Sequence, residues 1–258
     1  AQLAKVGSPL IIRAGDSLAE LKQLAKETGA ELITWNRRHE PLIVERDTRV
    51  KTSLRNAGLK AESFNGNLLH EPHLVKTLAG NPFQVFTPFW KNCLANLKFG
   101  EPLPAPRKLA SPTTAPRSLP LARLELLPKI AWAGGLAEAW TPTRAGAMQR
   151  LKAFVAAPVK AYPTDRDIPK LDGTSKLSPY LHFGQISAQH VAYEAARSEA
   201  SQANRDAFIE ELFVRRELAE NYCFYNERYD VFDALPELAK ATLMEHAADR
   251  RDYIYTPE

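Results

Sequence analysis

The sequence predicts an α/β domain followed by an all-α domain. Strand-like and helix-like apolar segments alternate between residues 8 and 98, the order expected for a parallel sheet with helices on its faces. From residue 144 onward the apolar residues recur at helical spacing. Eight of the 19 prolines lie between residues 99 and 143, a density that blocks regular helix and predicts an extended connector. The expected division is therefore an α/β domain over 1–98, a connector over 99–143 and a helical domain over 144–258.

The α/β domain is expected to contain five short elements. Gly15, Asp16 and Ser17 are typical of a turn and a helix N-cap, and Gly29 is typical of a helix end. The predicted strands are residues 9–13, 30–35 and 59–64, and the predicted helices run from residue 18 to Gly29 and over 43–54. Ligands of parallel sheets lie beyond the carboxyl ends of the strands, which makes the polar loop 36–41 a candidate ligand site.

The connector and the helical domain have their own patterns. Residues 126–132 and 140–142 carry tryptophan and leucine among the prolines and are expected to anchor the connector on a folded surface. Helices are predicted over residues 144–156, 180–197, 205–225 and 235–247.

Composition narrows the function classes only broadly. A hydrophobic content of 45% and a charged content of 25% are ordinary for globular proteins. The net charge of +4 permits a nucleic-acid partner without demanding one. Cys93 and Cys223 are far apart and lack metal-ligand spacing, so we expect reduced thiols, no metal and a cytoplasmic protein. No apolar run approaches the length of a membrane span, so no membrane partner is expected. The absence of an initiating Met suggests a fragment.

The segment that carries most chemistry is Gly173-Thr-Ser-Lys-Leu-Ser178. Three hydroxyls, a lysine and the backbone N–H groups of such a turn are able to face one anion. The alternative is a helix N-cap, because Ser or Thr before an apolar run is common. The residues alone leave both interpretations open.

This segment, with Tyr162 upstream and Leu181-His-Phe-Gly-Gln-Ile-Ser187 downstream, resembles the flavin-binding signature of the DNA photolyase/cryptochrome family. The resemblance implies that FAD is the cofactor, that Tyr162 lies against it, and that residues 174–178 surround its diphosphate. The implied cofactor-binding residues there are Tyr162, Thr174, Ser175, Lys176, Leu177 and Ser178.

The resemblance extends to the helix over 205–225 and to the segment after Tyr162. It implies that Phe208, Glu211 and Arg215 also line the flavin, whereas composition alone favours a surface ion pair between Glu211 and Arg215. Arg166, Glu211 and Arg216 are the implied contacts to damaged DNA, with a plain surface arginine as the alternative for Arg166. His182 is a weak candidate for the flavin site, because a single His beside a Phe usually fills the core or the surface. No catalytic residue is expected, since the cofactor carries the reaction.

The α/β part resembles the antenna domain of the same family, which implies a pterin or deazaflavin antenna chromophore. The candidate residues are Trp35, Arg37, Arg38 and Glu40. The alternative is a solvated charged loop.

Subfamily features are mixed. The sequence looks class I-like up to about residue 178 and class II-like after it. Class I enzymes have a tryptophan that packs on the lesion. A gapless alignment puts Val214 at that position, and an alignment of the Arg-Glu pair puts Arg215 there. The resemblance implies a Rossmann-like α/β domain lacking its first strand and an incomplete all-α FAD-binding domain, so that the chain is truncated at both ends.

The implied function is that of a deoxyribodipyrimidine photolyase, a carbon–carbon lyase that acts on UV-damaged DNA and is expected to be a monomer. The alternatives are a cryptochrome-type light sensor and an inactive photolyase fragment.

Overall fold

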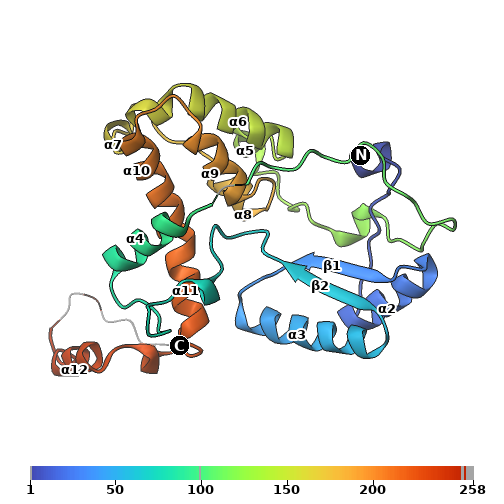
Figure 1. Cartoon of the computed structure of the whole chain (residues 1–258), viewed down its shortest axis with the longest axis horizontal. Coiled ribbons are helices and arrows are strands. Elements are labelled where there is room, and N and C mark those ends of the chain that lie inside the picture. The colour runs from blue at the N-terminus through green and yellow to red at the C-terminus, as the bar shows by residue number, and fades with distance from the viewer. Residues whose placement is uncertain (1, 99, 251–252, 254–258) are drawn as a thin grey trace.

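The computed structural model describes residues 2–98, 100–250 and 253, without the side chains of Gln2 and Arg215. The described residues form a small α/β unit and a larger helical unit that lie beside each other (Figure 1). No helix in these residues is long and apolar enough to cross a lipid bilayer.

The α/β unit is built around two parallel strands. After the short helix α1 (Gln2–Lys5), its elements are α2 (Ser17–Thr28), β1 (Leu32–Asn36), α3 (Pro41–Asn56) and β2 (Lys60–Phe64). The Asp16 carboxylate accepts the N–H of Ala19 at 2.9 Å and begins α2, and Gly29 ends it with a left-handed φ of 68°. Leu32 pairs with Lys60 and Asn36 with Phe64. These elements confirm the predicted order, with bounds shifted by a few residues.

A small core holds this unit together. Val50 and Leu54 of α3 and Ala61 of β2 are buried, and the partly buried side chains around them come from α2, from β1 and from Leu59 just before β2. The helices therefore cover the sheet through a few aliphatic contacts, while the larger core lies in the helical unit.

The predicted strand over 9–13 is wrong. These residues are extended, but they pair with the connector instead of with the sheet. The Ile12 N–H donates to Ser118 Oγ at 2.9 Å, and the Leu119 N–H donates to the Ile12 carbonyl at 2.9 Å. The segment thus finds its partners more than 100 residues later, which local apolar pattern does not reveal.

The connector is anchored at one of the two predicted places. Between residues 100 and 143 its helical pieces are short, and they are η2 (Leu121–Leu124) and α5 (Gly134–Ala139). Trp140 packs against Tyr180 with ring centroids 5.8 Å apart, and Arg150 lies over the indole, which confirms this anchor. Leu127 is 87% exposed and Trp132 is 76% exposed, so the anchor expected over 126–132 is wrong.

The helical unit contains most of the chain after the connector. Its helices are α6 (Arg144–Ala156), η3 (Pro158–Ala161), α7 (Tyr162–Asp165), α8 (Ser178–His182), α9 (Ala188–Ala196), α10 (Gln202–Leu212), α11 (Leu218–Tyr225), η5 (Phe232–Ala234) and α12 (Glu237–Glu245). A π-helical turn, η4 (Phe213–Glu217), lies between α10 and α11, and the three run on as one rod (Figure 1). One uninterrupted helix was predicted over 205–225, so the prediction missed the π-helical turn.

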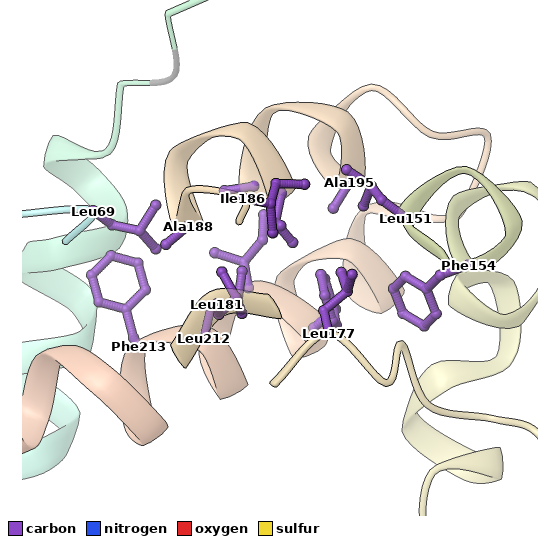
Figure 2. Close-up of a cluster of buried hydrophobic side chains, with 14 of the residues drawn as sticks. Leu69, Leu151, Phe154, Leu177, Leu181, Ile186, Ala188, Ala195, Leu212 and Phe213 are labelled. Carbon is purple, nitrogen blue, oxygen red and sulfur yellow. The ribbon is translucent and has the colours of Figure 1, made fainter. Parts of the chain in front are cut away.

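The helical unit also takes in residues from the first hundred. The loop from Asn65 to Glu71 leads from β2 to η1 (Pro72–Leu74), and α4 (Phe86–Asn96) follows. Phe89 and Cys93 of α4 are buried in the same core as α6, α9 and α10. Figure 2 shows this core, with Leu69 and Phe213 at one end and Phe154 at the other. The packing places residues 69–93 against the helices that carry the candidate site.

Candidate functional site

The hydroxyl turn, residues 173–178, lies between α7 and α8 in a conformation unlike a simple helix cap. The residue that precedes α8 is Leu177, and it makes no side-chain capping bond. Ser175 Oγ accepts the Leu177 N–H at 3.4 Å, and Lys176 has a left-handed φ of 53°. A non-glycine residue in this region is strained, and such strain gathers at ligand sites. The N-cap interpretation is therefore not what the structure shows.

The turn also packs tightly against α7. A Cβ added at Gly173 would lie 2.6 Å from the backbone carbon and oxygen of Asp165, so only glycine fits there. Leu177 is 1% exposed and packs in the hydrophobic core. The turn is thus fixed at both ends.

The hydroxyl turn forms one wall of the first cavity, which has a volume of about 740 Å³. Nine of the predicted site residues line it, and they are Tyr162, Arg166, Thr174, Ser175, Lys176, Ser178, Phe208, Glu211 and Arg216. Asp167, Leu181, His182 and Leu212 complete the lining. Leu177 is not in the lining, and the side chain of Arg215 lies outside the described residues. The structure therefore brings together nearly all residues that the sequence singled out.

Aromatic packing positions one side of the first cavity. The Phe154 and Phe208 rings are 4.5 Å apart between centroids, and Tyr162 meets Phe208 edge-on at 5.2 Å. All three side chains are buried. Their packing holds the rings of Tyr162 and Phe208, which line the cavity, in place.

Charged groups beside these rings are paired with one another. Arg166 Nη1 donates to Glu211 Oε1 at 2.6 Å, and the Arg166 guanidinium lies 5.6 Å from the Tyr162 ring centre. Glu211 raises the pKa of the Arg166 guanidinium through this bond. Lys176 pairs with Asp172 at 2.5 Å. Arg166 Nε and Arg216 Nε are buried and find no hydrogen-bond acceptor within the described part of the chain.

The second cavity, about 630 Å³, lies between the two units and shares Leu181, His182 and Arg216 with the first. Its other walls are residues 36–40, 66–68, 183–184, Ala219 and Glu220. The predicted residues Arg37, Arg38 and Glu40 line it, and Arg38 is bonded to Glu40, which lowers the pKa of that carboxyl to about 2. The cavity is polar because the Arg216 guanidinium and the carboxylates of Glu220 on α11 and Glu40 in the loop line it.

Trp35 lies elsewhere. It lines a third cavity of about 460 Å³ formed by α2, β1 and α3, which Arg38 also reaches. The Trp35 indole N–H is buried and has no acceptor among the residues described. The four predicted antenna residues are therefore divided between two cavities.

Sequence reasoning missed Glu217, the charged side chain that is most fully buried among those described, at 3% exposure. Burial raises its pKa to about 7, although the N–H groups of Leu69 and His70 act in the opposite direction. In the sequence it follows two arginines in a helical pattern and resembles an ordinary surface residue.

The sequence of this chain is similar to those of known proteins. A family model described as DNA photolyase matches residues 1–107. The chain is 39% identical over 186 residues to a deoxyribodipyrimidine photo-lyase of Agrobacterium fabrum, covering 72% of this chain and 39% of that one. It is 32% identical over 240 residues to cryptochrome-1 of Arabidopsis thaliana, covering 88% of this chain and 35% of that one.

The fold agrees with these similarities. The crystal structure of a bacterial class III photolyase from Agrobacterium tumefaciens superposes with a TM-score of 0.82 at 33% identity, covering 95% of this chain and 52% of that one. The chain thus spans between 35% and 52% of the length of these relatives. Similarity in sequence and in fold over most of its length shows that the chain belongs to the DNA photolyase/cryptochrome family.

Proposed function

We propose that this chain is the FAD-holding part of a deoxyribodipyrimidine photolyase, a carbon–carbon lyase that uses light to split cyclobutane pyrimidine dimers in UV-damaged DNA. The observation that carries the proposal is the first cavity, in which the hydroxyl turn faces the aromatic wall and Glu211. The photolyase relatives support it.

The chemistry of the first cavity fits FAD. Its volume of about 740 Å³ lies in the range of cofactor sites. Three hydroxyls and Lys176 supply the donors that a diphosphate requires. The proposed cofactor residues are those predicted from the sequence, with Arg215 included. Leu177 would act through its packing beneath the turn.

The protein residues would bind and orient, because the cofactor carries the chemistry. When bound, reduced FAD supplies the photo-excited electron that opens the dimer. The hydroxyl turn would hold the diphosphate, and Tyr162 and Phe208 would exclude water from one wall. A dimer must leave the stacked duplex to be reached, and Arg166, Glu211 and Arg216 are proposed to meet it as donors and an acceptor.

The proposal includes further features of the whole protein. The α/β unit is taken as part of a Rossmann-like antenna domain, and the helical unit as part of the FAD-binding domain. An antenna chromophore, a pterin or a deazaflavin, is proposed for the second cavity beside Arg38 and Glu40. A monomer in the cytoplasm is proposed, in keeping with the free thiols of Cys93 and Cys223.

The test is flavin retention followed by repair. The chain is purified with added FAD, and its visible absorption is compared with that of Thr174→Ala/Ser178→Ala and with Thr242→Ala/Ser53→Ala, hydroxyls remote from the cavity. We expect flavin bands in the wild type and the control, and their loss in the cavity variant. A blue-light repair assay on a thymine-dimer oligonucleotide follows, with a dark control. A colourless wild-type protein contradicts the proposal, and so does a cavity variant that keeps its flavin.

A light sensor of the cryptochrome type is the second candidate. Val214 stands where a gapless alignment expects an aromatic platform for the lesion, and cryptochrome-1 of Arabidopsis thaliana is among the relatives. Flavin that is retained and photoreduced without dimer repair would favour this candidate.

A further inference from the structure

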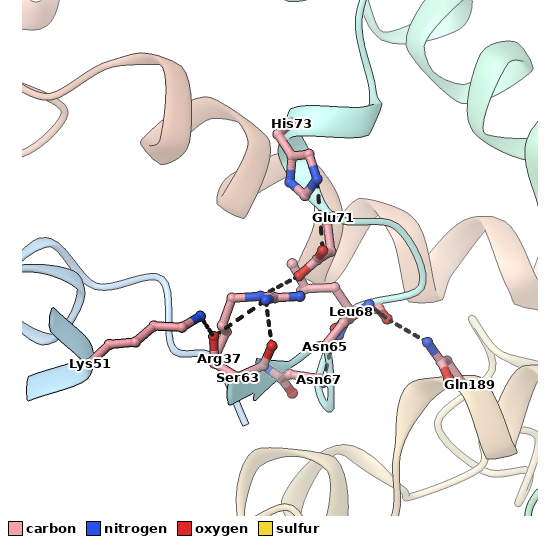
Figure 3. Close-up of polar contacts among 9 residues, drawn as sticks. All are labelled: Arg37, Lys51, Ser63, Asn65, Asn67, Leu68, Glu71, His73 and Gln189. Carbon is pink, nitrogen blue, oxygen red and sulfur yellow. Dashed lines mark hydrogen bonds and ion pairs between the residues drawn. The ribbon is translucent and has the colours of Figure 1, made fainter. Parts of the chain in front are cut away.

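The loop over residues 65–71 joins the sheet to the helical unit and is held by side chains of that unit. Three polar contacts fix its backbone or the residue after it. They run from Gln189 Nε2 to the Leu68 carbonyl (3.3 Å), from Arg216 Nη2 to the Asn67 carbonyl (2.8 Å) and from the Tyr225 hydroxyl to the Pro72 carbonyl (3.1 Å). Figure 3 shows Gln189 reaching this loop from the helical side.

Glu217 makes two further contacts with this loop, one of which is buried. Its Oε1 accepts the Leu69 N–H at 2.8 Å, and its Oε2 accepts the His70 N–H at 3.0 Å. Both carboxylate oxygens are thus used on two consecutive backbone donors. The side chain comes from the π-helical turn, and such turns often mark functional positions.

The other side of the loop is held by the α/β unit. Arg37 Nε donates to Glu71 Oε1 at 2.6 Å, and Arg37 Nη1 donates to the Ser63 carbonyl at 2.6 Å (Figure 3). Arg37 belongs to residues 36–40, which line the second cavity. Glu217 is therefore connected to that wall of the cavity through the backbone of residues 69–71 and the ion pair between Glu71 and Arg37.

We propose that Glu217 is a positioning residue, which holds the loop at Leu69 and His70 and thereby sets the separation between the two walls of the second cavity. One wall is residues 36–40 and 66–68, and the other is residues 181–184 with Arg216 and Glu220. The geometry stands by itself, and only the identity of the ligand between the walls rests on the proposed function.

The position of the loop should respond to pH. Opening the loop exposes the Glu217 carboxyl to water, where its charged form is favoured, so opening becomes easier as the pH rises through about 7. The titratable and charged groups around Glu217 are Arg216 and Glu220 on the same rod, His70 on the loop and Cys93 on α4. Burial lowers the pKa of His70, although its bond to the Cys93 carbonyl acts in the opposite direction.

The first test is amide hydrogen exchange on the full chain, with rates corrected for intrinsic pH dependence. We expect Leu69 and His70 to lose protection as the pH rises from about 6 to about 8, whereas amides of β1 and β2 do not. Glu217→Gln keeps one acceptor and should remove this pH dependence. Glu217→Ala should lower protection at both amides by on the order of tenfold, and Glu245→Gln, an exposed carboxyl on α12, should change nothing.

Protection at Leu69 and His70 that is independent of pH in the wild type would overturn the proposal, even if Glu217→Ala did not fold. Protection that is unchanged in Glu217→Ala would also overturn it. If Glu217 only filled space in the core, protection at Leu69 and His70 would be independent of pH.

The second test measures the cavity with 5-formyltetrahydrofolate as a pterin probe. Glu217→Ala should weaken binding of the probe by on the order of tenfold, and Glu245→Gln should not. If the wild type binds no probe, the antenna proposal fails, while the exchange data still decide the role of Glu217. If the wild type and Glu217→Ala bind equally well, the positioning role is wrong.

Discussion

Arg166 of the segment after α7 donates to Glu211 of α10 at 2.6 Å and so joins two elements on opposite sides of the hydroxyl turn. The two side chains are 33% and 26% exposed, which places the pair at the boundary between the first cavity and solvent. The two residues are 45 positions apart in sequence, and Tyr162, over whose ring Arg166 lies, packs edge-on against Phe208 of α10.

The Arg166–Glu211 pair should contribute measurably to stability. A double-mutant cycle with Arg166→Ala and Glu211→Ala should give a coupling free energy of about 1 kcal/mol, because the pair is partly shielded from water. Arg228 and Asp233 are paired at 2.6 Å and are 64% and 61% exposed, so the same cycle there should give about 0.3 kcal/mol or less. Urea denaturation measures both. Equal coupling at the two sites would contradict this view of the cavity edge.

Gly173→Ala should disrupt the hydroxyl turn. The added methyl would lie 2.6 Å from the Asp165 backbone, which cannot move without shifting α7 and Tyr162. We expect weaker FAD binding by fluorescence titration and a lower melting temperature. Gly134→Ala is the control, since a Cβ there meets nothing within 4 Å. Unchanged FAD binding in Gly173→Ala would show that the turn does not set the cofactor site.

Phe154→Ala should destabilise the helical unit by about 3 to 5 kcal/mol, because a fully buried ring leaves a cavity. Phe154 is 2% exposed and contacts both Tyr162 and Phe208. Phe154→Leu should cost less, and Phe232→Ala, at 55% exposure, should change the free energy of unfolding by less than about 1 kcal/mol. Denaturant titrations measure these free energies of unfolding. A decrease in Phe154→Ala that is no larger than the decrease in Phe232→Ala would contradict the packing described.

The free energy of unfolding should depend on pH through Glu217. Its pKa is raised from 4.5 to about 7 in the folded protein, so the folded state binds this proton more tightly than the unfolded state does. Stability from this group is full at acidic pH below the unfolded value and is lost as the pH rises through about 7. We expect a decrease of about 1 to 3 kcal/mol from about pH 5 to about pH 8. Glu217→Gln should flatten this part of the profile. If Glu217→Gln shows the same decrease in the free energy of unfolding with pH, the decrease comes from other titratable groups.

The two thiols should differ in reactivity. Burial raises the pKa of Cys93 to about 12, so its thiol is protonated at neutral pH and shielded by the core. Cys223 is only partly buried. Native-state labelling with a thiol reagent, followed by mass spectrometry, should modify Cys223 first and Cys93 only after unfolding. Rapid modification of Cys93 in the native protein would show that α4 does not pack as described.

Local signals explain which elements could be predicted. Asp16 and Gly29 bound α2 through capping chemistry that acts within a few residues, so the sequence was sufficient. The segment around Ile12 has the same apolar composition as a sheet strand, but its partner is Ser118, and nothing near Ile12 encodes that choice. The π-helical turn is likewise invisible in the periodicity of 205–225, and its Glu217 makes a tertiary contact with Leu69, 148 residues away.

The candidate site follows the same division. Thr174, Ser175 and Ser178 were recognisable because their chemistry is concentrated in one short segment, and the structure places them in one cavity. Arg166 was expected toward DNA, and its bond to Glu211 needed the fold to be seen. Trp35 and Arg37 are only two residues apart, yet they line different cavities, because β1 ends at Asn36 and Arg37 lies in the loop beyond it.

The bonds between Ile12 and residues 118–119 bear on how the protein is made. A ribosome extends a chain from its N-terminal to its C-terminal side, so the segment around Ile12 must wait until residues 118–119 have emerged before it can form these bonds. Such late pairing slows the closure of the first unit and leaves its apolar residues exposed to other nascent chains. Translation speed through the proline-rich stretch therefore becomes a determinant of yield.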